Sequence, residues 1–121
     1  MKGIHHIVVF CTDTGASKAW YQKAGFKYLR GYQGMHWLDA GGFEVMLHPS
    51  KIKPNGALPN IHISVGDVNE HFEKVRKAGL EPVDHQSPNR AKLEQPVTRP
   101  WGDTEFELID PDGNVWVFTQ A

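Results

Sequence analysis

Apolar and polar residues alternate along two short stretches of the chain, residues 4–11 and 60–65. This alternation is typical of strands that bury one face. Each stretch leads to an aspartate, Asp13 (followed by Thr14) or Asp67, and then to a segment whose composition suits a helix. Because an aspartate or threonine is favoured at a helix N-terminus, the pattern predicts a strand followed by a helix, twice.

Each predicted helix ends at a Lys-Ala-Gly triplet, which places Gly25 and Gly79 at the position where glycine is favoured just after a helix. The triplets begin at Lys23 and Lys77 and therefore lie 54 residues apart, and the same offset relates the two aspartates. The chain thus contains two diverged copies of one unit.

Three further strands complete each copy. They are predicted near 26–32, 35–40 and 43–48 in the first copy and near 80–85, 104–109 and 115–119 in the second. Gly41-Gly42 and Pro111-Asp112-Gly113 are typical of the tight turns that join the last two strands. We therefore predict an α+β fold with the order βαβββ twice.

The whole chain, residues 1–121, is predicted to be a single domain. It consists of module 1 (residues 1–50), a linker (51–59) and module 2 (60–121). The second module carries an insertion, residues 87–103, which is too long for a plain connection between strands. The insertion is either a lid over a pocket or a surface loop, and the sequence does not choose between them.

The alternation also assigns side chains to the two faces of each sheet. One face is apolar and should pack against the helices. The other face mixes apolar with polar residues and should line a cavity. Its members in module 1 are His6, Val8, Phe10, Glu44, Met46 and His48, and in module 2 Asn60, His62, Ser64 and Val117.

The charge of the chain narrows the classes of partner. Its 13 basic and 14 acidic residues give a net charge of −1 without any run of Lys or Arg, which excludes a nucleic acid partner. No apolar stretch is long enough to span a membrane. The one cysteine, Cys11, excludes an intramolecular disulfide and suits a reducing cytoplasm, where we expect the protein.

Seven histidines raise the question of a metal site. His5 follows the strand alternation and should point away from the face that carries His6. His71 and His85 are expected to be solvated, and His36 could lie on the mixed face or on the surface.

The doubled βαβββ unit, His6 seven residues before Asp13 and the Ile109–Asn114 turn resemble the vicinal oxygen chelate superfamily. This group includes glyoxalase I, extradiol dioxygenases, fosfomycin-resistance enzymes and bleomycin-resistance proteins. Pro100-Trp101-Gly102 followed by Phe106 adds to the resemblance, which covers nearly the whole chain. It implies a curved mixed sheet that forms a cup, helices on its outer face, and a homodimer.

Metal enzymes of this superfamily hold a divalent ion with residues on the first and last strand of each module. The corresponding positions in this chain are His6, Met46, Asn60 and Val117. Of these only His6 is a good ligand, since Met and Val supply no hard oxygen donor. The resemblance therefore implies that the metal site is absent, and no cofactor is expected.

An alternative arrangement stays open. His6, His62 and Glu44 would form a two-histidine, one-carboxylate set for a displaced divalent ion if the strands brought them together. Otherwise these side chains would hydrogen-bond one another, a ligand or water. Trp20 and Trp116 are assigned to the core.

Two functions follow. The first is the binding of a small organic molecule in the cup, as in bleomycin-resistance-like proteins, without a metal. The alternative is a metal-dependent lyase, isomerase or dioxygenase that uses the displaced site, and no catalytic residue can be assigned. A structural or interaction domain is a third reading. The predicted ligand-binding residues are His6, Phe10, Trp37, Glu44, Met46, His48, Asn60, His62, Trp101 and Val117.

Overall fold

The structure is a computed structural model that describes residues 1–51, 61–84 and 86–120. The chain divides into two compact units. Unit 1 comprises Met1–Leu58 together with Asp110–Asn114, and unit 2 comprises Pro59–Ile109 together with Val115–Ala121. The predicted linker lies almost wholly outside the described residues.

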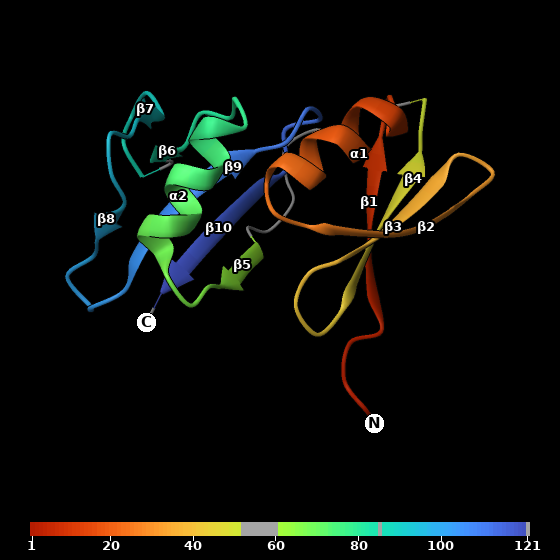
Figure 1. Cartoon of the computed structure of the whole chain (residues 1–121), viewed down its shortest axis with the longest axis horizontal. Helices are drawn as coiled ribbons and strands as arrows, with labels where there is room; N and C mark the ends of the chain where they lie inside the picture. Colours follow the sequence, from red (N-terminus) through yellow and green to blue (C-terminus); the bar gives the residue numbers. More distant parts are fainter. Residues whose placement is uncertain (52–60, 85, 121) are drawn as a thin grey trace. The chain divides into compact units, whose positions relative to one another are not determined.

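Unit 1 is a four-stranded sheet with one helix on one of its faces (Figure 1). Its elements in chain order are β1 (His6–Cys11), α1 (Thr14–Lys23), β2 (Lys27–Tyr32), β3 (Met35–Asp39) and β4 (Glu44–Pro49). The strand order is β1-β4-β3-β2, in which β1 and β4 are parallel and the other pairs antiparallel. Because the chain returns to the first strand with its last, the module is a βαβββ unit, as predicted.

Unit 2 repeats this plan and adds strands to it. Its elements are β5 (Ile61–Ser64), α2 (Val68–Lys77), β6 (Val83–Asp84), β7 (Ala91–Lys92), β8 (Val97–Thr98), β9 (Thr104–Ile109) and β10 (Val115–Gln120). The parallel pair β5 and β10 corresponds to β1 and β4, and α2 packs on β9 and β10. The α+β fold with a doubled βαβββ unit is therefore confirmed.

The strand predicted at 80–85 is shorter than expected, since β6 holds only Val83–Asp84. The backbone N–H of Leu80 donates to Val75 as part of the helix-ending turn, and Pro82 has no N–H to offer to a neighbouring strand. The insertion also differs from a loop, because it contributes β7 and β8, which pair with β6 and β9.

The two helices begin and end as the sequence predicts. The carboxylates of Asp13 and Asp67 each accept a hydrogen bond of 3.0 Å from the backbone N–H three residues further on. Gly25 (φ +108°) and Gly79 (φ +96°) adopt the left-handed conformation just after each helix. There the next backbone N–H reaches back to the last turn, a helix end that favours glycine.

The cores lie between each helix and its sheet. The largest fully buried side chains include Tyr21, Leu38 and Leu47 in unit 1, and Phe72, Phe106, Trp116 and Phe118 in unit 2. The assignment of Trp116 to the core is confirmed, and Trp20 is half-buried against Tyr21. The buried side of α1 runs through Ser17 and Tyr21, and Ala19 is exposed.

The turn Asp110–Asn114 belongs to unit 1, although the strands on either side of it belong to unit 2. The Asp110 carboxylate accepts a hydrogen bond of 2.6 Å from the Tyr21 hydroxyl. The Asp112 carboxylate accepts bonds from the backbone N–H and the hydroxyl of Thr12, at 3.1 and 2.8 Å. Both carboxylates are buried, so the turn holds the segment just before α1 and the last turn of that helix.

Burial raises the pKa of the Cys11 thiol to about 12, so this cysteine stays protonated and serves as a core residue.

Among the described residues, no helix has the length and apolar character needed to cross a membrane.

Candidate functional site

The sheet of unit 1 has a face that α1 does not cover, here called the open face. Strand register arranges its side chains in three rows. The first row holds His6, Glu44, Asp39 and Lys27, and the second holds Val8, Met46, Trp37 and Arg30. The third holds Phe10 and His48, with Met35 and Tyr32 on the neighbouring strands. One end of the face is therefore charged, and its middle and other end are apolar and aromatic.

Apolar side chains on the open face are exposed. Val8 is 39% exposed, Phe10 49% and Tyr32 63%. On the opposite side of the same strands Val9, Val45 and Leu47 are almost fully buried. The mixed face predicted from the alternation is thus present, and it brings six of the predicted ligand contacts onto one surface.

The charged end is organised by Arg30, which sequence reasoning missed. Its two terminal nitrogens donate to the two carboxylate oxygens of Glu44, at 2.8 and 3.3 Å. Its guanidinium carbon lies 5.1 Å from the centre of the Trp37 ring. The hydrogen bond from Arg30 is the main reason that the pKa of Glu44 is lowered, and nearby His5 and His6 add to the effect.

Arg30 was missed because strand β2 is irregular. Tyr28 pairs with Leu38, but the next pair joins Arg30 to Trp37, so Leu29 is an extra residue in the strand. Simple alternation from Tyr28 would place Arg30 on the helix-covered face. The bulge moves it to the open face, and the one sign of a bulge within residues 27–32 is Gly31.

His5 and His6 are in contact, which corrects the expectation that they point to opposite faces. Their Nδ1 atoms are 2.8 Å apart, so one ring donates a hydrogen bond and the other accepts it. Alternation does not apply to His5, because β1 begins at His6. The pair lies beside Glu44, which is the register partner of His6.

The other end of the open face is aromatic. The rings of Phe10 and His48 meet edge to face, with their centres 5.6 Å apart. Nδ1 of His48 donates to the carbonyl of Pro49 at 2.8 Å, which fixes the orientation of its ring. Phe10 and His48 therefore form an aromatic pair of fixed orientation beside Val8 and Met46.

The remaining predicted contacts belong to unit 2. His62 is exposed and lies 3.5 Å from the Thr119 hydroxyl through its Nδ1, and Trp101 is 63% exposed. Val117 is fully buried, so a ligand could reach it only if neighbouring side chains moved. Asn60 lies outside the described residues.

Unit 2 carries a buried ion cluster that sequence reasoning missed. Arg99, from the insertion, donates to Glu105 through Nε and to Asp84 through Nη2, both at 2.8 Å. Its Nη2 is also 3.7 Å from the Glu107 carboxylate. The hydrogen bonds from Arg99 to Asp84 and Glu105 raise the pKa of Arg99. A Glu-x-Glu alternation directly after the insertion was the available signal, because Glu105 and Glu107 share the face opposite the helix.

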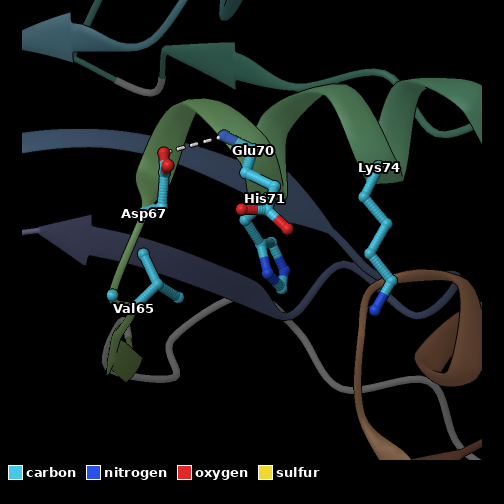
Figure 2. Close-up of a pocket in the computed structure, with 6 residues that line it drawn as sticks. Val65, Asp67, Glu70, His71 and Lys74 are labelled. Atoms are coloured by element: carbon cyan, nitrogen blue, oxygen red, sulfur yellow. Dashed lines mark hydrogen bonds between the residues drawn. The ribbon is translucent and has the colours of Figure 1, made fainter.

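A hollow of about 290 Å³ lies at the start of α2 (Figure 2). It is lined by Val65, Gly66, Asp67, Glu70, His71 and Lys74. His71 is not simply solvated, as was predicted, because its ring stacks on Phe118 with centres 4.9 Å apart. None of these residues was among the predicted contacts, since the alternation of strands says nothing about a helix surface.

His36 lies on neither of the expected surfaces. It is the register partner of Leu47 on the helix-covered face and is 3.3 Å from the Tyr28 hydroxyl through its Nδ1. Burial, with a smaller effect of Lys18, lowers the pKa of His36. His85 lies outside the described residues.

The described donors do not fit a divalent ion. No group of three or more His, Cys, Asp and Glu side chains in the described ranges is placed to hold one. Met46 and Val117 offer no hard donor, and Glu44 is held by Arg30. Because Asn60 is not described, a metal-free site stays a prediction.

The fold and the open face define a class: two-module α+β proteins whose sheets leave one face free of helices. The chain belongs to the Glyoxalase/Bleomycin resistance protein/Dioxygenase superfamily, whose sequence model matches residues 3–118. The resemblance drawn from the sequence is therefore confirmed. A search of curated proteins found no match.

Several solved structures share the fold. A bleomycin resistance determinant encoded on the transposon Tn5 superposes with a TM-score of 0.74 at 19% identity, covering 98% of this chain and 97% of that one. TioX from Micromonospora sp. ML1 gives 0.71 at 22% identity, covering 98% of each chain. Lactoylglutathione lyase from Agrobacterium tumefaciens gives 0.70 at 16% identity, covering 100% and 95%. At these identities the likeness concerns the fold.

Proposed function

We propose that this protein binds a small organic molecule on the open face of unit 1, without the metal that enzymes of the superfamily use. The observation that carries the proposal is the layout of this face, where exposed apolar and aromatic side chains adjoin a charged row. Apolar surface with a few placed polar groups is the usual composition of a small-molecule site.

The rows suggest how such a molecule would lie. An apolar ring would rest on Val8, Met46 and Trp37 in the middle row, where burial of its surface provides most of the affinity. A polar group would then reach Glu44 or His6 in the charged row. His62, Asn60, Trp101 and Val117 stay predictions as further contacts.

The test is a thermal-shift screen of small organic compounds, followed by affinity measurement by calorimetry. Trp37→Ala and Phe10→Ser should each weaken a compound found in this way by tenfold or more, which corresponds to about 1.4 kcal/mol. Ile4→Ser is the matched control, since Ile4 is an exposed apolar residue that precedes β1. Compounds that bind equally well to Trp37→Ala and the parent protein would contradict the proposal, as would a screen without any binder.

Metal content tests the other part of the proposal. Protein prepared without a histidine tag should contain no stoichiometric Zn, Mn, Fe or Ni. A stoichiometric ion that is lost in His6→Ala would instead support the alternative, a metal-dependent lyase, isomerase or dioxygenase. The homodimer and the cytoplasmic location also stay predictions.

A further inference from the structure

Arg30 is held on the open face by a pair of groups that suit a planar cation. The Glu44 carboxylate takes both terminal nitrogens of the guanidinium in a fork, at 2.8 and 3.3 Å. The Trp37 ring lies 5.1 Å from the guanidinium carbon. A carboxylate fork and an aromatic face are the two features that recognise guanidinium and amidinium groups.

Arg30 itself is weakly bound to this place. Its side chain is 53% exposed, and exposed ion pairs of this kind contribute little to stability. Arg30 sits on β2, an edge strand of the sheet, and its long side chain can rotate into solvent. A ligand cation can therefore take its position at small cost.

We propose that the Arg30 guanidinium occupies the position of the ligand cation when no ligand is bound. The open face would then bind compounds in which a planar delocalised cation is attached to an apolar ring. This inference rests on the proposed function and names the ligand class of that site. The cation would replace the guanidinium between Glu44 and Trp37, and the ring would cover Met46 and Val8, which follow Trp37 across the middle row.

The surroundings favour a cation over an anion once Arg30 has moved. Asp39 is the register partner of Glu44 on β3, and Lys27 on β2 is the register partner of Asp39. Without Arg30 the first row therefore has two carboxylates against the one ammonium group of Lys27. A planar cation is preferred to an ammonium because only the planar group can use both oxygens of Glu44 and the ring of Trp37 together. His5 and His6, whose Nδ1 atoms are 2.8 Å apart, also lie near Glu44.

Benzamidine, a phenyl ring that carries an amidinium, is a suitable probe in calorimetry. Arg30→Ala should bind it at least fivefold more tightly than the parent protein, because the place is then vacant. Adding Glu44→Gln or Trp37→Ala to Arg30→Ala should weaken binding at least tenfold. Arg30→Gln, which keeps a polar side chain of similar length, provides a second vacated variant in case Arg30→Ala does not fold.

Arg76→Ala is the matched control. Arg76 also pairs with carboxylates and lies 5.5 Å from an aromatic ring, but that ring, Phe72, is buried. Removing Arg76 should therefore leave benzamidine binding unchanged.

Benzoate, an anion of similar shape to benzamidine, tests the opposite role, in which Arg30 itself binds an anionic ligand. If benzoate binds the parent protein and is lost in Arg30→Ala, Arg30 is an anion-binding residue and the inference is wrong. It is also wrong if benzamidine binds no better to Arg30→Ala than to the parent. Both results leave the proposed function standing, provided that screened compounds still depend on Trp37. Failure of the proposed function would instead appear as the absence of any Trp37-dependent binder.

Discussion

The pKa of His36 depends on the packing of α1 against the sheet. The Nδ1 atom of His36 meets the Tyr28 hydroxyl, and the ammonium of Lys18 on α1 lies 3.9 Å from the centre of the Tyr28 ring. Protonation of His36 would place a second cation in this half-buried corner. Burial of the ring is the main reason that the pKa of His36 is lowered from the ordinary value of 6.5, and the nearby charge of Lys18 adds to it.

The free energy of unfolding should therefore depend on pH through His36. Because the unfolded chain takes up this proton at a higher pH than the folded chain, the stability is complete above about pH 6.5 and falls as the pH decreases below it. Chemical denaturation of the parent protein and His36→Gln at several pH values should show a difference that changes in this range. Lys18→Met should reduce the dependence, and a difference that is constant with pH would contradict the assignment.

Tyr21 illustrates a contact whose partner is far away in the chain. It is fully buried, and its hydroxyl donates to Asp110 across 89 positions of sequence. Tyr21→Phe should lower the free energy of unfolding by about 2 kcal/mol, the usual range for a hydrogen bond to a charged group. Tyr32→Phe is the control, since Tyr32 is mostly exposed and should change stability little. Equal effects of the two variants in urea denaturation would contradict this role.

At the scale of elements, Arg99 attaches the insertion to the sheet of unit 2. It follows β8 directly and meets Glu105 on β9 and Asp84 on β6, so one side chain joins three strands. The insertion is therefore not a free lid but part of the sheet structure.

Removal of Arg99 should be costly because it leaves buried carboxylates without their counter-ion. Arg99→Ala should lower the free energy of unfolding by about 3 kcal/mol or more. Lys92→Ala is the control, because the ion pair of Lys92 with Glu81 is exposed and should contribute less than about 1 kcal/mol. Denaturation of both variants in urea measures the difference, and a small effect of Arg99→Ala would show that the cluster relaxes or takes up protons.

Sequence reasoning predicted the elements that local chemistry determines. Asp13, Asp67, Gly25 and Gly79 set the ends of both helices through contacts within five residues, and these ends are confirmed. It missed Arg30, whose side of the sheet depends on a bulge for which Gly31 was the one sign in the strand.

At the scale of the whole molecule, the repeat identified the fold and the superfamily, and both are confirmed. The candidate site was predicted in part. Alternation placed His6, Phe10 and Met46 on one face, because a strand fixes the direction of its side chains. The charged contacts, such as those of Arg99 with three carboxylates, could not be predicted in this way. They depend on which strands pair, and pairing is a property of the tertiary structure.

The turn at Asp110–Asn114 has a practical consequence for anyone who wishes to divide this chain. The repeat suggests that the chain could be divided near residue 58 into two fragments that fold independently. Such a cut would deprive the first fragment of Asp110 and Asp112, the acceptors for Tyr21 and Thr12. The halves are thus copies in sequence without being interchangeable parts, and a split-protein reporter would have to keep that turn with the first half.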